Sequence, residues 1–405
     1  MFRTTSSRRQ SEGADGLIAS GILVPANFAI GTLADSRHSV VIVGGGVAGC
    51  ATAIALARRG VAGVAVVEMQ RGATWRIGEA IPPAGNRILR GLGLWEDFLG
   101  QDHLPSAGSC ASWGNPELGY NDFLLDLQGK GWHLDRAAFD AMLSGAVEAR
   151  GAELMRGHRL RAAERGRDGL HVLSFERDDG VRVRIAADIL VDATGIAAGA
   201  VRRLGVARNQ IDCLAVVSAV FDLADADAVP SQTLLEACED GWWYAAKLPN
   251  QRMIVALAVE PSRRRRFGEI GIFRAALRAT RHVARWLERG KAALTDRFTL
   301  ATALAPSAIL SRVVGDRWLA VGDAASACDP ITAQGIVKAL CDGEAAADTI
   351  AAHLAGAGDA PLLAYQEGVF ARFRDYLRLR QHLYGRERRW PQAPFWQNRL
   401  APGGV

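Results

Sequence analysis

The chain has 405 residues, of which 49% are hydrophobic and 22% charged, a balance typical of globular proteins. No apolar run approaches the roughly 20 residues of a membrane span, and the six cysteines show no C-x-x-C spacing, so a membrane protein, a zinc ribbon and a disulfide framework are excluded. The net charge of +5 is mild, and no DNA- or RNA-binding motif accompanies it, so we expect no nucleic-acid partner and a reducing, cytoplasmic location.

Residues 1–37 do not resemble part of a folded domain. They begin polar and turn-rich and continue weakly apolar, interrupted by glycine and proline. Arg8 and Arg9 precede the apolar part as they would in an export signal, but no small-residue cleavage site ends it. We expect a disordered extension, or a start codon assigned too far upstream.

The segment from Val40 to Glu68 predicts a dinucleotide-binding βαβ unit. A buried apolar strand precedes Gly44, Gly46 and Gly49, an alanine-rich helix follows, and a second apolar strand ends at Glu68. Gly44 permits the tight turn, Gly46 lets the backbone approach a pyrophosphate, and Gly49 lets helix and strand pack closely. Glu68 stands where its carboxylate can accept hydrogen bonds from ribose hydroxyls.

The remaining elements predict an α/β fold, in which a Rossmann-like FAD-binding domain carries an inserted antiparallel sheet and a helical C-terminus. We expect helices at 83–99 and 135–150, a hairpin of 170–175 with 181–185, a buried strand at 187–191, sheet strands at 213–222, 233–238, 242–247 and 253–259, a strand at 317–321 and a long helix from about 334. The FAD-binding domain would comprise residues 38–205 and 300–352, the substrate domain 206–299, and the C-terminal helix and tail 353–405.

A second motif follows the predicted strand at 317–321. Gly322 and Asp323 stand at its end, where the carboxylate can bind a ribose or ribityl hydroxyl. The stretch from Pro330 to Gly335 can present backbone N–H groups and a helix N-terminus to the N1–C2=O edge of a reduced flavin. An ordinary capped helix is the alternative, since Asp329 and Pro330 would serve that too.

Taken together, these motifs resemble the FAD-dependent monooxygenase and halogenase superfamily, whose fold is that of p-hydroxybenzoate hydroxylase. The resemblance rests on V-x-G-G-G-x-A-G, on the segments 76–79 and 192–195, and on Gly322-Asp323. It implies that Glu68 binds the adenosine ribose, that Arg76 lies along the flavin or pyrophosphate, and that Asp323 binds the ribityl or pyrophosphate region. It also implies oxygen transfer through a C4a-hydroperoxyflavin.

A finer resemblance, to flavoprotein maturases, extends over segments 78–83, 131–136, 241–244 and 389–396. These maturases serve lysine ε-oxidase and glycine oxidase that carry cysteine tryptophylquinone. The resemblance implies hydroxylation of a tryptophan in a partner oxidase. It leaves open whether NAD(P)H reduces the flavin directly or through a separate reductase.

Halogenation is the main competing chemistry. Flavin-dependent tryptophan halogenases carry the same glycine fingerprint and G-E segment, and in addition a W-x-W-x-I-P motif and a lysine that meets hypochlorous acid. Here residues 242–249 depart from that motif, and the stretch aligned with the lysine, Ser109 to Ser112, has none. Without a positioned ammonium, halogenation loses its activating group. A small-molecule hydroxylase and a flavin-binding chaperone of a partner enzyme are further alternatives.

Candidate catalytic residues face the join between the sheet domain and the flavin: His133, Glu79, Trp242 and Tyr244. His133 is favoured as acid/base because an unperturbed imidazole titrates near about 6.5, although a structural histidine is an equal alternative. Adjacent Trp242 and Trp243 must face opposite sides of a strand, so we expect one of them in the core.

Three further features concern the cofactor and the surface. Asp135 is a good N-cap and Arg136, at the same helix start, is a cofactor candidate by resemblance. Arg263 to Arg266 are expected to begin a solvated helix running to about Arg289. The tail from 388 to 396 either folds back on the core or docks a partner, and we favour the former.

Overall fold

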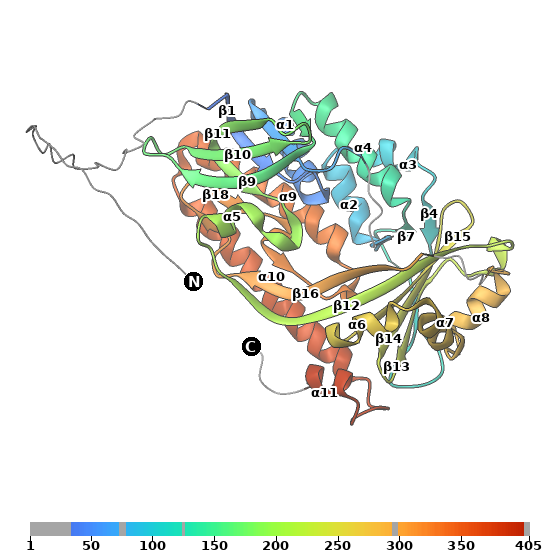
Figure 1. Cartoon of the computed structure of the whole chain (residues 1–405). Coiled ribbons are helices and arrows are strands. Elements are labelled where there is room, and N and C mark those ends of the chain that lie inside the picture. The colour runs from blue at the N-terminus through green and yellow to red at the C-terminus, as the bar shows by residue number, and fades with distance from the viewer. Residues whose placement is uncertain (1–33, 73–77, 124–125, 294–298, 401–405) are drawn as a thin grey trace, which may run out of the picture. The chain divides into compact units, whose positions relative to one another are not determined.

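The computed structural model describes residues 34–72, 78–123, 126–293 and 299–400 (Figure 1). Two large β-sheets and a three-stranded one are joined by helices in this part of the chain. Residues 1–33 of the expected N-terminal extension lie outside the described residues, whereas Ser36 and Arg37, which the sequence analysis also places in it, pair with β11 (Arg182–Asp192) as the start of β1 (Ser36–Val43).

The first sheet has a parallel centre, as the buried apolar runs predict. Its strand order is β17-β18-β11-β1-β2-β8, and β10 and β9 extend it antiparallel from β11. Its strands are β1 (Ser36–Val43), β2 (Val64–Glu68), β8 (Glu153–Arg156), β9 (His158–Arg165), β10 (His171–Arg177), β11 (Arg182–Asp192), β17 (Val314–Gly315) and β18 (Trp318–Ala320). β1 lies parallel to both β2 and β11, which confirms the predicted βαβ unit.

β11 corrects one expectation, since it replaces two predicted strands, 181–185 and 187–191. Its first half pairs antiparallel with β10 and its second half parallel with β1 and β18. Ala186 and Ala187 are buried, and no glycine or proline interrupts the ladder there, so the backbone stays extended.

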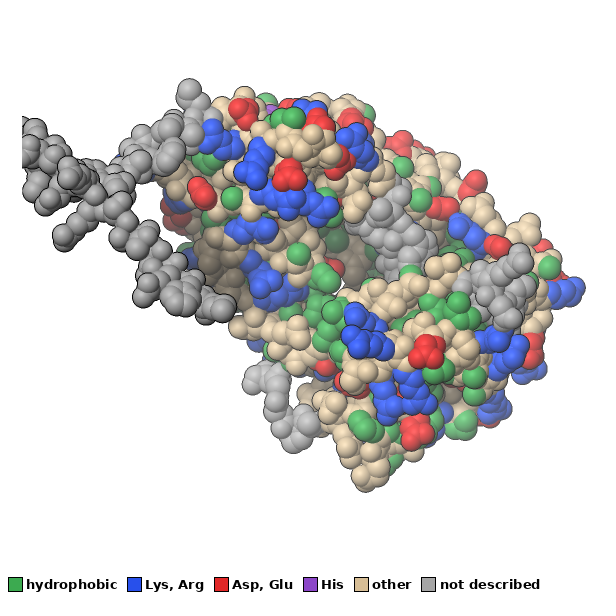
Figure 2. Space-filling view, in the orientation of Figure 1, with side chains coloured by type: hydrophobic (Ala, Val, Ile, Leu, Met, Phe, Trp, Pro, Cys, Tyr) green, Lys and Arg blue, Asp and Glu red, His purple; other side chains and the backbone are tan. Residues whose placement is uncertain are grey.

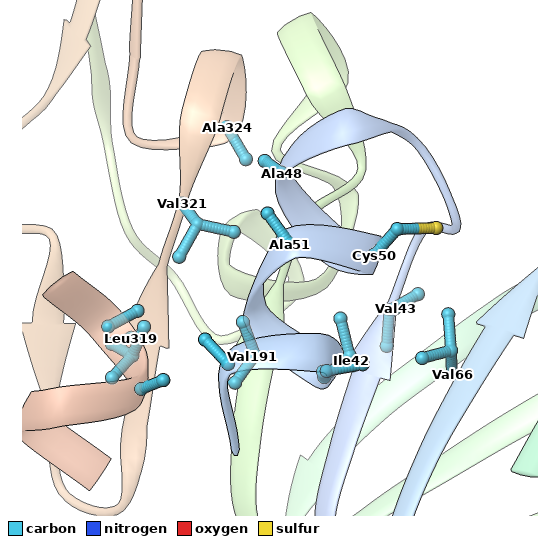
Figure 3. Packing of buried hydrophobic residues seen from close by; sticks show 14 of the residues in the cluster. Ile42, Val43, Ala48, Cys50, Ala51, Val66, Val191, Leu319, Val321 and Ala324 are labelled. Atoms are coloured by element: carbon cyan, nitrogen blue, oxygen red, sulfur yellow. The ribbon is translucent and has the colours of Figure 1, made fainter. Parts of the chain in front are cut away.

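Helices α1 (Val47–Arg58), α4 (Arg136–Ala149) and α9 (Gly335–Ala352) accompany this sheet, and α5 (Gly199–Arg203) follows β11. Small side chains let α1 approach its neighbours closely, as Figure 3 shows for Ala48 and Ala51 beside Val321 and Ala324. A Cβ added at Gly343 of α9 would lie 2.7 Å from the Ala51 Cβ, so glycine is required at this crossing.

The second sheet is mostly antiparallel and contains the four strands that the sequence predicts. Its order is β19-β16-β12-β15-β14-β13-β5-β6. The strands are β5 (Gly108–Ser112), β6 (Gly119–Asp122), β12 (Arg208–Asp222), β13 (Thr233–Cys238), β14 (Gly241–Leu248), β15 (Arg252–Val259), β16 (Ala301–Leu310) and β19 (Ser326–Ala327). Segments outside 206–299 thus join this sheet, and the domain limits drawn from the sequence stay a prediction.

The third sheet is small and has the strand order β3-β7-β4. It consists of β3 (Ala80–Ile81), β4 (Leu104–Ser106) and β7 (Gly131–His133). Ala80 of β3 and Leu104 of β4 both pair with His133, so the strand that carries this histidine is central.

Two predicted helices are divided in the structure. The one expected at 83–99 is α2 (Ala84–Gly91) and α3 (Trp95–Leu99), separated at Gly93, whose φ of 66° is left-handed. The one expected after Arg263 is α6 (Arg264–Phe267), α7 (Ile270–Arg278) and α8 (Val283–Arg289). The buried Glu236 carboxylate of β13 accepts the N–H groups of residues 281–283, which fixes a new helix start there.

The C-terminal helices α10 (Ala360–Gly385) and α11 (Pro394–Leu400) connect the two large sheets (Figure 1). The Tyr365 hydroxyl donates to the Ala320 carbonyl of β18, and the Tyr384 hydroxyl accepts from Trp242 of β14. Trp396 is 1% exposed and donates from Nε1 to the Cys238 carbonyl at 3.0 Å. The tail therefore folds back on the core, as expected. In the described residues, no helix is long and apolar enough to cross a membrane.

Replacing Trp396 by alanine is expected to lower the free energy of unfolding by about 3–5 kcal/mol, because the change leaves a cavity and orphans the Cys238 carbonyl. Urea denaturation measures this. Leu400→Ala, at an exposed position of the same helix, is the control and should cost well under half as much. Equal losses in both variants would contradict the bracing role of the tail.

Candidate functional site

The glycine loop after β1 has the geometry of a phosphate cradle. Gly44 has a φ of 110°, and a Cβ there would lie 2.3 Å from the Ala193 carbonyl oxygen. A Cβ at Gly49 would lie 1.9 Å from the Gly44 carbonyl oxygen, so the first turn of α1 rests directly on the loop. Gly46 is the N-cap of α1, whose first N–H groups have no intrahelical acceptor and can bind an anion.

Glu68, at the end of β2, lies against this loop. Its carboxylate accepts the N–H groups of Gly45 at 2.6 Å and Gln70 at 2.8 Å. A carboxylate has about four acceptor positions, so two remain for ribose hydroxyls.

Asp192, in the motif at 192–195, shapes the opposite wall and does not face a ligand. This fully buried carboxylate accepts N–H groups from Thr194, Ala200 and Val201 and the Thr194 hydroxyl. The turn that it closes presents the Ala193 carbonyl to Gly44.

The turn at Gly322 and Asp323 meets the same helix from the other side. Gly322 has a φ of 58°, and a Cβ there would lie 2.7 Å from the Ala48 Cβ of α1. Asp323 is open to solvent, yet surrounding protein atoms desolvate its carboxyl and raise its pKa. A carboxylate at this position can accept hydrogen bonds from the hydroxyl groups of a bound ligand.

Lys338, on α9, is a residue of this site that the sequence analysis missed. Its Nζ donates to the Gly322 carbonyl and to Asp342 Oδ2, both at 2.9 Å, and Asp342 also binds Arg372. Lys338 therefore fixes the Gly322 turn relative to α9. The i,i+4 spacing of Lys338 and Asp342 is the signal that could have indicated it.

The segment from Pro330 to Gly335 ends in an exposed helix N-terminus. Asp329 Oδ1 accepts the Ile331 N–H at 2.9 Å, and Ala333 takes a left-handed φ of 49° before α9 begins. Pro330 and Gly335 are exposed, and nothing lies within 4 Å of a Cβ built on Gly335. Asp329 caps the short turn at Pro330–Thr332, and α9 begins after it without a side-chain cap, so the binding of a flavin by this N-terminus stays a prediction.

These residues fit an adenine dinucleotide. A glycine loop, two helix N-termini and the carboxylates of Glu68 and Asp323 supply the donors and acceptors that a pyrophosphate and two polyol chains require. Arg76 lies outside the described residues. Arg136 donates to the Gly78 carbonyl at 2.6 Å and pairs with Asp140, so it holds the segment just before Glu79.

Glu79 is the most perturbed carboxyl of the candidate site. It is 3% exposed, and among the described residues neither carboxylate oxygen has a hydrogen-bond partner. Burial raises its pKa to about 7, against an ordinary value of 4.5. A carboxyl with this pKa can hold a proton near neutral pH and release it.

Tyr244 of β14 lies within electrostatic reach of Glu79. Burial, and then the Glu79 charge, raise the pKa of the phenol well above its usual value, so the hydroxyl stays protonated. The structure thus brings together Tyr244 and Glu79, which are 165 positions apart in the sequence.

His133 is fully buried, and its Nε2 lies 3.0 Å from the Thr233 Oγ1 of β13. Burial lowers the pKa of the imidazole to about 4, so the ring is neutral at physiological pH. The reason for favouring it as acid/base, a pKa near about 6.5, does not hold in the fold. Glu79 is the group that titrates near neutrality instead.

Trp242 and Trp243 face opposite sides of β14, as the alternation predicts. Trp243 packs on Phe273 of α7 at 5.2 Å between ring centroids. Trp242 donates from Nε1 to the Tyr384 hydroxyl at 3.1 Å and is 3% exposed. Both rings are therefore buried, and Trp242 belongs to the cluster under the C-terminal helices.

The ammonium groups of all four lysines are engaged. Lys247 Nζ donates to the Ala226 carbonyl at 3.2 Å, Lys291 pairs with Asp225 at 3.1 Å, and Lys130 lies 4.8 Å from the centroid of Trp132. Lys338 binds Gly322 and Asp342 as above. β5, which spans Ser109 to Ser112, supplies no lysine to the site.

Comparison with known proteins agrees with this geometry. The family described as FAD binding domain matches residues 37–376. LodB of Marinomonas mediterranea, described as an FAD-dependent oxidoreductase, is 29% identical over 367 residues, which cover 90% of this chain and 97% of LodB. A 1H-pyrrole-2-carbonyl peptidyl-carrier-protein brominase of Pseudoalteromonas luteoviolacea is 24% identical over 77% of each chain.

Solved structures include similar chains from both chemistries. The flavin-dependent halogenase CmlS superposes with a TM-score of 0.79 at 24% identity, over 91% of this chain and 68% of CmlS. The peptidyl tryptophan dihydroxylase QhpG, essential for tryptophylquinone cofactor biogenesis, has a TM-score of 0.73 at 25% identity, over 90% of this chain and 79% of QhpG.

Gly46→Val is expected to abolish stoichiometric FAD binding, because a branched side chain at the N-cap of α1 would occupy the space of the pyrophosphate. The ratio of flavin to protein absorbance measures this. Gly145→Ala on α4, where a Cβ meets nothing within 4 Å, should retain full FAD. A yellow, fully loaded Gly46→Val protein would disprove the phosphate-loop assignment.

Glu79 is expected to make the FAD-free protein less stable as the pH rises from about 4.5 to about 7. The folded state holds this proton more tightly than the unfolded chain does, so the free energy of unfolding falls through that window and then levels off. The loss attributable to Glu79 is about 3 kcal/mol. Urea titrations of wild type and Glu79→Gln across this range measure it, and parallel pH profiles would contradict the raised pKa.

Proposed function

The chain belongs to the FAD binding domain family, and on this premise we propose that it is an FAD-dependent monooxygenase that hydroxylates a tryptophan of a partner oxidase during tryptophylquinone formation. The observation that supports the choice of oxygenation is that no lysine among the described residues supplies a free ammonium to the site; the buried Glu79 carboxyl, in a segment that halogenases share, is the candidate proton donor.

The cofactor would be held by the glycine loop after β1 on one side and by the turn at Gly322 and Asp323 on the other. Gly44, Gly46 and Gly49 bind the pyrophosphate with the N-terminus of α1, and Glu68 binds the adenosine ribose. Gly322 and Asp323 bind the ribityl chain, and the segment from Pro330 to Gly335 faces the N1–C2=O edge. Arg76 and Arg136 lie along the cofactor.

The bound flavin, once reduced, supplies the activation of dioxygen. Glu79 would be about half protonated near pH 7, because burial raises its pKa to about 7, so its carboxyl could hold a proton in the site and release it. The partly buried Tyr244 ring packs against the cluster under the C-terminal helices and would help to exclude water from the site. Neutral His133 would position β7 through its contact with Thr233 of β13. Trp242, on the same face of β14 as Tyr244, is held by its hydrogen bond to Tyr384.

A protein substrate is supported by the similarity to QhpG, which acts on peptidyl tryptophan, at 25% identity over most of both chains. The partner would be an oxidase that carries a quinone cofactor. Electrons would come from NAD(P)H, directly or through a separate reductase. Six unpaired cysteines are consistent with a cytoplasmic protein.

Halogenation of a small aromatic metabolite is the second candidate, since flavin-dependent halogenases are prominent among the similar proteins. It requires an activating group other than a lysine, since all four ammonium groups are engaged elsewhere. A flavin-binding chaperone, which binds the partner without modifying it, is a further alternative.

Co-expression with a quinone-cofactor oxidase is expected to add oxygen to a tryptophan-containing peptide of that partner, which peptide mass spectrometry measures. At equal FAD content, Glu79→Gln should lower the rate at which the partner is modified by at least about 100-fold, because the site loses its proton donor. Glu164→Gln, at an exposed carboxylate of β9, is the matched control and should behave as wild type.

Other outcomes of the same experiment separate the alternatives. Bromine on the peptide, or on a free aromatic compound when bromide is supplied, would establish halogenation. A stable complex with an unmodified partner would establish the chaperone.

A further inference from the structure

Positive charge is concentrated in one short part of the sequence. Residues 261–291 contain nine arginines and one lysine against two glutamates, whereas the whole chain has a net charge of only +5. The remaining residues together therefore carry a net negative charge. The proposed function makes no use of this segment.

The fold places this charge on the outer face of the second sheet. Phe267, Phe273, Leu277 and Trp286 of α6, α7 and α8 are buried against the sheet and anchor the three helices. The opposite sides of the helices carry exposed cationic side chains, and Figure 2 shows Lys and Arg side chains spread over this part of the surface. The exposed arginines are Arg264, Arg265, Arg266, Arg278, Arg281, Arg285 and Arg289, which we name the basic helical surface.

Much of this charge is not neutralised within the protein. Arg281 pairs with Glu117 at 2.9 Å, and Arg266 stacks on Phe267 at 5.5 Å. Arg264, Arg265, Arg278, Arg285 and Arg289 form no ion pair with any of the residues that the structure describes. Glu269 and Glu288 are the acidic residues of the segment itself, so cations outnumber anions on these helices.

This excess of positive charge destabilises the folded state, and folding does not require it. Like charges on neighbouring helical turns repel, and uncharged polar side chains would cover the same core equally well. The remaining residues are net negative on average, although a second group of exposed arginines lies between residues 159 and 182. The excess of positive charge on these helices favours an acidic partner and influences the orientation in which it arrives.

We propose that the basic helical surface docks an acidic face of the protein substrate; this inference rests on the proposed function. β14 carries Tyr244 on one face and Trp243 on the other, and Trp243 packs on α7. The docking surface thus lies behind the sheet that forms the site. It contributes affinity and association rate without touching the reacting ring.

To test the docking proposal, one variant replaces an exposed arginine on each of the three helices: Arg265→Glu, Arg278→Glu and Arg285→Glu. The matched control is Arg159→Glu, Arg167→Glu and Arg182→Glu, three exposed arginines near β9 to β11 with the same change in net charge. Fluorescein-labelled polyglutamate is the probe, titrated into FAD-loaded protein at low and physiological salt. Thermal melting and flavin absorbance verify that both variants are folded and loaded.

The basic-surface variant is expected to bind polyglutamate at least about tenfold more weakly than wild type, and the control within about twofold. Equal losses in both variants would overturn the proposal, since binding would then depend on net charge alone. Tighter binding of a DNA duplex or of phosphatidylserine vesicles than of polyglutamate at physiological salt would also overturn it, in favour of a nucleic-acid or membrane surface.

Co-expression with the oxidase separates this proposal from the proposed function. If wild type and control modify the partner while the basic-surface variant modifies at least about tenfold less, both proposals hold. Equal modification by all three refutes docking but not the function. Failure of wild type to modify any partner refutes the function, and the polyglutamate titration then still decides whether the surface is an acidic-protein site.

Discussion

The buried carboxylate of Asp329 joins three parts of the molecule that are distant in sequence. It accepts the Ile331 N–H, which shapes the turn before α9, and the Tyr384 hydroxyl of α10. Tyr384 in turn accepts the indole N–H of Trp242 on β14. Because a buried carboxylate is costly without partners, these contacts must form together, and the turn before α9, the C-terminal helix and the second sheet are fixed by one network.

Burial divides the chemistry of the titratable groups at the join. The same desolvation raises the pKa of Glu79 and lowers that of His133, so near neutral pH the imidazole is uncharged and the carboxyl can hold a proton. Under the proposed function, oxygen transfer to an aromatic ring needs a proton donor, and the buried Glu79 carboxyl near Tyr244 suits that role. The fold is shared with halogenases, so the fold by itself does not choose between oxygenation and halogenation.

The second sheet has different tasks on its two faces. One face carries Tyr244 and Trp242, with Trp242 packed under the C-terminal helices, and the other is covered by helices whose outer surface is basic. A site that accepts a residue of a folded protein gains little from a deep pocket, because most of the partner remains outside it. Recognition by a charged surface away from the reacting ring is one solution to this constraint.

The βαβ unit and its glycines could be predicted from the sequence because every group involved lies within one continuous stretch, from Val40 to Glu68. The four strands of the second sheet followed from alternation for the same local reason. Only the tertiary structure placed Glu79 against Tyr244, neutralised His133 and closed the network of Asp329, because a pKa and a buried hydrogen bond depend on which distant side chains exclude water from a group. It also divided the helix expected from Arg263 to Arg289, since the Glu236 carboxylate that starts α8 comes from another strand.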